Sequence, residues 1–276
     1  MSNKTISILN LLSVIILIAW NAYASNGNYN GKTVGELSAE YNNLFTPASY
    51  AFSIWGLIFL MLLVFGIYGV YTAFSKGQQS KTKSYRTDVV KTTSPWFLAA
   101  NVFCTLWVVL WLDEHIAASV IFMCGILFCL LMCVRLLDME IWDAPFPIIA
   151  FVWWPLCLYA GWISVALIAN IAAFLNGIFE IHISTQIITT AVMIFVAFAL
   201  NMAILYFRNM REYAMVCVWA LVAIGVRHYN GPVNYLGILA FALALFLLIA
   251  VVYHGSQHMD THPLIKFKQW RSTKNL

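Results

Sequence analysis

Long apolar runs, separated by short polar segments, recur along the whole chain and limit what it can fold into. A helix needs about 20 mainly apolar residues to cross a bilayer. The chain is 62% hydrophobic and only 9% charged, with a mean hydropathy of +0.82, which lies outside the range of soluble globular domains. We therefore predict an all-α, polytopic transmembrane helix bundle. The expected spans are residues 5–24, 47–74, 95–112, 116–137, 145–174, 186–207, 213–227 and 233–254.

Three of these runs need separate comment. Residues 145–174 are long enough to be tilted or broken near Pro155, and residues 213–227 are short for a span. The first run, which follows a lysine and ends near Ala24, also resembles a secretory signal with a small-residue cleavage site. We favour a retained helix because the run is as long as a span and carries Trp20, which suits an interfacial anchor.

The basic residues give an independent test of the span count. Lys and Arg collect on the cytoplasmic side of membrane proteins. With eight spans and an inside N-terminus, 13 of the 15 Lys and Arg residues fall inside and only Lys32 and Arg227 fall outside. We therefore expect both termini to be cytoplasmic. The net charge of +4 reports topology, so we predict the lipid bilayer as a partner and no nucleic acid.

The second run begins with a pattern typical of a helix start. Thr46 can cap the first free amides, and Pro47 suits the first helical position because it has no amide hydrogen to lose. Residues 25–45 before it are rich in Asn and Gly. We expect that segment to pack as a lid over the outer end of the bundle.

Aromatic and polar residues share one helical face on each of three runs. A single Trp or Tyr in a membrane helix is usually an interfacial anchor or a gap filler. The convergence of four tryptophans from three runs instead indicates an aromatic cavity with a few polar atoms, the kind of site that holds a flat apolar ligand. The predicted ligand-binding residues are Phe52, Trp55, Asn101, Trp107, Trp111, Tyr159, Trp162 and Asn170.

In this order and spacing, these motifs resemble the TspO/MBR family, the tryptophan-rich sensory proteins, and in particular its longer bacterial branch. The resemblance implies a five-helix core over residues 1–175, three additional helices over residues 176–256 and a basic cytoplasmic tail over residues 257–276. The chain departs from the family pattern at Cys104, where many members have Asn, and at Ala48, where many have a second Pro. The residues that carry the resemblance are Pro47, Phe52, Trp55, Trp107, Trp111, Ser119, Met123, Pro155, Tyr159, Trp162 and Asn170.

The resemblance also implies a function. It predicts an integral protein of the bacterial inner membrane, a receptor that binds a hydrophobic, tetrapyrrole-like ligand such as porphyrin or haem for sensing or regulation. No other cofactor and no enzyme activity are implied, apart from the remote alternative of porphyrin photodegradation by the tryptophans. Two alternative functions stay open: a transporter or facilitator of a small amphipathic ligand, and a structural or assembly partner in the membrane. A homodimer also stays open.

Two classes of membrane protein are disfavoured by what the runs lack. An ion-coupled pump needs ionisable groups within its spans, and the long runs after residue 143 contain none at mid-span. A retinal protein needs a lysine deep in a late helix, and no lysine lies between Lys91 and Lys266. Neither a nucleophile–base pair nor a phosphate-binding loop is recognisable, so we predict no catalytic residues.

A row of histidines near the C-terminus gives the one metal hypothesis. His254, His258 and His262 are four residues apart, which would align their rings on a continuous helix for Zn²⁺ or axial haem ligation. Gly255 weakens such a helix and Pro263 ends it. We therefore interpret the row as a solvated cluster beside the membrane and predict no metal site.

Overall fold

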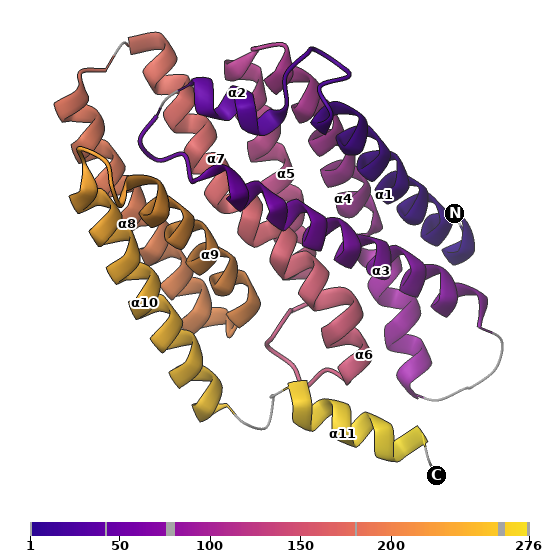
Figure 1. Ribbon diagram of the computed structural model, residues 1–276. Helices are drawn as coiled ribbons and strands as arrows, with labels where there is room; N and C mark the ends of the chain where they lie inside the picture. Colours follow the sequence, from indigo (N-terminus) through magenta and orange to yellow (C-terminus); the bar gives the residue numbers. More distant parts are fainter. Residues whose placement is uncertain (1, 42, 76–80, 180, 259–262, 275–276) are drawn as a thin grey trace.

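The computed structural model describes residues 2–41, 43–75, 81–179, 181–258 and 263–274 (Figure 1). It is 84% helical, and the described residues contain no strand, so the all-α prediction is confirmed. The elements are α1 (Asn3–Ser25), α2 (Val34–Glu40), η1 (Ser49–Ser53), α3 (Ile54–Phe74), α4 (Lys81–Leu112), α5 (Ile116–Leu136), α6 (Phe146–Ile148), η2 (Ile149–Trp153), α7 (Trp154–Phe179), α8 (Ile183–Arg208), α9 (Arg211–His228), α10 (Asn234–Gln257) and α11 (Pro263–Lys274).

Seven helices in the described part of the chain are long and apolar enough to cross a membrane, where the sequence predicted eight. The missing one is 213–227, which is helical but belongs to α9. This helix carries Arg211, Glu212 and Arg227 near its two ends and packs against α7, α8 and α10. It is thus a largely protein-enclosed helix, and its three charged residues set it apart from the apolar spans. The seven spans are Asn3–Ala24, Ser49–Phe74, Thr92–Leu112, Ile116–Leu136, Phe146–Phe179, Ile183–Arg208 and Asn234–Gln257.

The helices pack in two neighbouring groups (Figure 1). Helices α1, α3, α4, α5 and α7 contact one another in one group, and α8, α9 and α10 form the other. The groups meet where α7 crosses α9. At that contact a Cβ added to Gly161 would lie 3.0 Å from the carbonyl oxygen of Tyr213 and 3.1 Å from Cβ of Val216. A side chain larger than that of glycine would therefore push the two helices apart here.

The expected break near Pro155 is present as a π-helical turn. Element η2 covers Ile149–Trp153 and ends two residues before Pro155, inside the continuous span Phe146–Phe179. Proline has no amide hydrogen for the carbonyl four residues earlier, and its ring clashes with that carbonyl in a regular α-helix. The wider turn accommodates both effects.

The expected helix start at Thr46 and Pro47 is wrong. The first helical turn, η1, begins at Ser49, and its N-cap residue is Ala48, which has no capping side chain. The Thr46 hydroxyl is buried and has no hydrogen-bond partner among the described residues. Asn43 organises the turn instead, because its Oδ1 accepts hydrogen bonds from the amides of Phe45 (3.1 Å) and Thr46 (2.9 Å).

In the C-terminal tail, α11 folds back against α6. The ring of Phe146 contacts Phe267 and Trp270, and Lys266 pairs with Asp143. Before α11, the rings of His254 and His258 stack with 4.3 Å between centroids. The third histidine of the row, His262, lies outside the described residues, which hold no group of three metal-ligating side chains.

Candidate ligand-binding pocket

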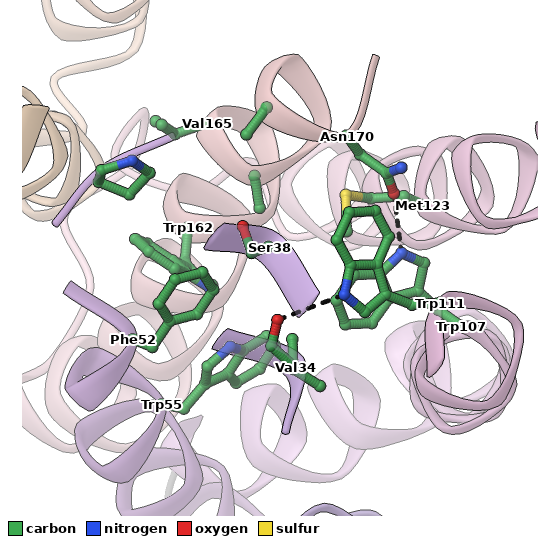
Figure 2. A pocket seen from close by; sticks show the side chains of 13 residues that line it. Val34, Ser38, Phe52, Trp55, Trp107, Trp111, Met123, Trp162, Val165 and Asn170 are labelled. Atoms are coloured by element: carbon green, nitrogen blue, oxygen red, sulfur yellow. Dashed lines mark hydrogen bonds between the residues drawn. The ribbon is translucent and has the colours of Figure 1, made fainter. Parts of the chain in front are cut away.

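One end of the first helix group is covered by α2. An aromatic pocket lies at that end, beneath α2 (Figure 2). Its cavity volume is about 40 Å³, which is room for one or two water molecules. Among the described residues that line it, none is ionisable. The lining residues are Val34 and Ser38 of α2, Pro47, Phe52 of η1, Trp55 of α3, Trp107 and Trp111 of α4, Met123 of α5, and Trp162, Val165, Ala166, Ala169 and Asn170 of α7.

Aromatic rings form two opposite walls of this pocket (Figure 2). On one side, Phe52 meets Trp162 edge to face with 6.0 Å between ring centroids, and Trp55 lies beside them. On the other side, Trp107 and Trp111 stack at 5.9 Å with an interplanar angle of 19°. Both arrangements are preferred geometries of aromatic pairs. The two walls leave an apolar slot between them.

The indole N–H groups of the second wall are used inside the protein. Trp107 Nε1 donates to Oδ1 of Asn170 at 2.9 Å, and Asn170 Nδ2 donates to Oγ of Ser119 at 2.9 Å. Trp111 Nε1 donates to the backbone oxygen of Val34 at 3.3 Å. These bonds hold the two rings in place, so the wall presents ring surface rather than free N–H donors.

Helix α2 closes the pocket as a lid. A capping box stabilises its start, since Thr33 Oγ1 accepts from the amide of Glu36 and Glu36 Oε2 accepts from the amide of Thr33. The lid is attached to the pocket by the Trp111–Val34 bond and by the ring of Tyr41, which packs 5.5 Å from that of Trp111. The expectation that this segment covers one end of the bundle is met in the fold.

A larger cavity adjoins the pocket. Its volume is about 330 Å³, and it shares Val34, Phe52, Trp55 and Trp107 with the pocket. These four residues form a partition between the small apolar pocket and the larger cavity. The remaining lining is mixed in polarity and comprises Asn21, Thr33, Gly35, Glu36, Ser49 and Phe59.

Six of the eight residues predicted as ligand contacts line the pocket, and two do not. Tyr159 is fully buried behind the wall, where its ring meets that of Trp55 at 6.0 Å. Asn101 points to α1, where its Nδ2 donates to Oγ of Ser13 at 2.9 Å. The six lining residues are Phe52, Trp55, Trp107, Trp111, Trp162 and Asn170.

Several lining residues were missed by the sequence prediction. Val165, Ala166 and Ala169 lie three, four and seven residues after Trp162, so the helical period alone indicates that they share its face. Val34 and Ser38 come from the lid. Their signal was the capping-box pattern at the start of α2, which predicts a helix there but not its place over the pocket.

Comparison with known protein families gives a match along most of the chain. A family model described as TSPO-like protein matches residues 7–253. The chain belongs to the TSPO-like family. The match runs through α8, α9 and α10 as well as the first helix group, so the TSPO-like region includes both. No curated protein and no solved structure matches the chain. Family membership and seven apolar spans together make this TSPO-like chain an integral membrane protein.

Proposed function

We propose that this protein binds a flat, hydrophobic, tetrapyrrole-like ligand, such as porphyrin or haem, for sensing or regulation. The observation that carries the proposal is the pocket itself, in which four tryptophans from three helices surround an apolar slot. Aromatic faces offer large contact areas at low entropic cost, and a few fixed polar atoms set orientation. Ser38 and the second amide hydrogen of Asn170 are the polar groups for that purpose, since Asn170 is otherwise bonded to Trp107 and Ser119.

The size of the closed pocket implies that binding changes its shape. A space of about 40 Å³ cannot hold a macrocycle. The lid side of the partition, at Val34, must therefore move and join the slot to the adjoining cavity of about 330 Å³. A protein whose lid has to open for its ligand has two distinguishable states, which is what a receptor needs.

The test is a fluorescence titration of the purified protein with protoporphyrin IX and haemin. Tryptophan emission should be quenched with saturation at micromolar ligand. Trp162→Phe should weaken binding by about tenfold because it removes part of one wall. Trp96→Phe is the matched control, since Trp96 contacts Phe128 outside the pocket. Absence of saturable quenching, or equal binding by both variants, would contradict the proposal.

A second candidate function is facilitated movement of a small amphipathic ligand. It is favoured by the shared partition, because a ligand entering the mixed-polarity cavity needs to displace only Val34 and its neighbours to reach the apolar slot. Uptake of a labelled porphyrin into proteoliposomes, compared with liposomes lacking the protein, distinguishes this function from binding alone.

We also propose that the pocket end faces away from the cytoplasm of a bacterial cell. Two basic residues lie at that end, Lys32 beside Glu40 and Arg227 beside Asn43. Arg208 and Lys266 contact the opposite end, through Val134 and Asp143. With α9 as an eighth helix between α8 and α10, this distribution suits an inside location for both termini. Labelling of single cysteines at Ser2 and Asn30 in intact cells should modify only the second.

A further inference from the structure

The wall of the pocket that contains Pro47 and Phe52 is attached to α9, a helix of the second group. Arg227 is central to the attachment, because its Nη1 donates to the backbone oxygens of Asn43 (3.0 Å) and Thr46 (2.6 Å). The other bonds run from His228 Nε2 to the oxygen of Leu44 (2.7 Å), from the amide of Ala48 to the oxygen of Ala223 (3.1 Å), and from Trp219 Nε1 to the oxygen of Ala51 (3.1 Å).

This segment needs partners from outside itself. Asn43, Phe45 and Thr46 are each at most 3% exposed, and the stretch before η1 is not helical. Buried backbone oxygens are costly when they lack a donor. Since a carbonyl oxygen only accepts, His228 Nε2 carries the proton in its bond to Leu44. Arg227 and His228 therefore satisfy three carbonyl groups of the wall.

The position of Arg227 on its own helix supports the same role. It lies in the last turn of α9, where a positive charge is favourable beside the carbonyl end of the helix dipole. A guanidinium can also hold two acceptors from a single nitrogen while its stem packs along apolar surface. An arginine at this site thus joins the helix end and the pocket wall.

The lid and the wall of the pocket differ in the number of hydrogen bonds that attach them to the rest of the protein. The lid α2 and its C-cap residue Tyr41 are attached by two long hydrogen bonds, from Trp111 Nε1 to the oxygen of Val34 (3.3 Å) and from the Tyr41 hydroxyl to Glu114 Oε2 (3.4 Å), and by the contact between the Tyr41 and Trp111 rings. The loop before α2 adds one bond, from Asn30 Nδ2 to the oxygen of Leu112 (2.7 Å). The wall from Asn43 to Ser53 is attached to α9 by the five bonds given above. The lid is therefore the part that yields when a ligand enters, and the wall is the part that stays.

We propose that α9 fixes the pocket wall and that Arg227 is the positioning residue, so that the three C-terminal helices form the rigid side of the ligand site. Arg227 acts through the backbone of residues 43–46 and touches no ligand itself. The ligand part of this inference rests on the proposed function, whereas the positioning of the wall does not. It assigns a role to the second helix group, which lines no part of the pocket with its own described side chains.

The test compares Arg227→Met, which keeps an unbranched apolar stem and removes the donors, with Arg227→Lys, which restores donors. Arg208→Met is the matched control, because Arg208 also donates to a backbone oxygen, that of Val134 at 3.2 Å, at the opposite end of the bundle. Hydrogen exchange of the amides of residues 44–53 is measured without ligand. Arg227→Met should speed this exchange about tenfold, Arg227→Lys should restore most protection, and Arg208→Met should leave it unchanged.

The second measurement is the affinity for protoporphyrin IX. Arg227→Met should bind about tenfold more weakly than the unaltered chain, with Arg227→Lys in between. Unchanged exchange and unchanged affinity in Arg227→Met would overturn the inference. If the unaltered chain binds no protoporphyrin IX, the proposed function fails while the ligand-free exchange still decides the role of Arg227.

A variant independent of Arg227 covers the case in which Arg227→Met does not fold. Trp219→Phe removes the N–H that donates to Ala51, together with part of the indole, and keeps an aromatic ring beside Tyr50. It should raise exchange in residues 51–53 and leave the amides of α2 unaffected. Unchanged exchange there would count against α9 as the support of the wall.

Discussion

The indole nitrogen of Trp107 donates to Oδ1 of Asn170 at 2.9 Å, across the space between α4 and α7. Asn170 also bonds to Ser119 of α5, so one buried amide joins three helices at the wall of the pocket. Hydrogen bonds between helices in an apolar environment fix their relative rotation. The hydrogen bonds of Asn170 therefore hold the aromatic wall at Trp107 in place.

Replacing Asn170 by Leu should destabilise the protein. It leaves Trp107 Nε1 and Ser119 without their partner, which costs about 1–3 kcal/mol. Thermal unfolding in detergent should show a lower midpoint. Asn201→Leu is the control, because the side-chain amide of Asn201 bonds only to Ala197 on its own helix. An equal loss in both variants would contradict the role of Asn170 as a joint between helices.

Shortening Val34 should ease ligand entry. Val34 is part of the partition between the pocket and the adjoining cavity, and Val34→Ala enlarges the passage between them. Stopped-flow quenching with protoporphyrin IX should show a several-fold faster association. Val192→Ala is the control, because Val192 is 56% exposed on α8 and should behave like the unaltered chain.

The capping box of α2 gives a prediction about the lid. Thr33→Ala removes the acceptor for the Glu36 amide and should cost the helix about 0.5–2 kcal/mol. Hydrogen exchange in residues 34–40 should become faster, with little change in the unfolding midpoint because α2 is short and peripheral. Glu36→Gln, which still accepts from Thr33, should have a smaller effect. Slower or unaltered exchange in Thr33→Ala would show that the cap does not control the lid.

Replacing glycine by alanine should change the stability of the protein in opposite directions at two positions. Gly161→Ala forces a Cβ to within 3.0 Å of the Tyr213 oxygen and should lower the unfolding midpoint by separating α7 from α9. At Gly56 an added Cβ meets no described atom within 4 Å, so Gly56→Ala should raise stability by about 0.5–1 kcal/mol. Parallel unfolding scans measure both, and a stable Gly161→Ala would argue against close contact of the two helices.

Glu140 predicts a pH dependence of stability. Burial, assisted by the negative charge of Glu212 and offset in part by Arg211, raises the pKa of this loop carboxyl from 4.5 to about 8. The folded state therefore binds a proton that the unfolded state releases between those values, and stability should fall as the pH rises from about 4.5 to about 8. Glu140→Gln should unfold at nearly the same temperature from pH 5 to pH 8. A variant that keeps the slope of the unaltered chain would assign it to another group.

The sequence carried enough information for most of the bundle and for two walls of the pocket. Apolar length located seven of the spans, and the spacing of Trp107, Trp111 and Trp162 placed their rings on faces that do meet. Periodicity succeeds here because a helix fixes the direction of each side chain relative to its neighbours. The proline signal at Pro155 was equally local, and the π-helical turn is found beside it.

What the sequence did not predict depends on contacts between distant segments. Thr46 has the residue type of an N-cap, but the turn made by Asn43 and the donors of Arg227 place the helix start later. Asn101 lies near the expected face, yet Ser13 on α1 is its partner. Helix α9 was expected to be an apolar span, although the helices around it allow charged ends. The errors at Asn101 and in α9 concern polar groups whose partners lie far away in the chain.

The π-helical turn at Ile149–Trp153 has a consequence for every residue after it in α7. One extra residue in a helical turn advances the following side chains by about 100° around the helix axis. Trp162 and Asn170 both lie beyond the turn and both line the pocket. Deleting a single residue between 149 and 153 would therefore aim both side chains at a different neighbour while leaving their own helix intact.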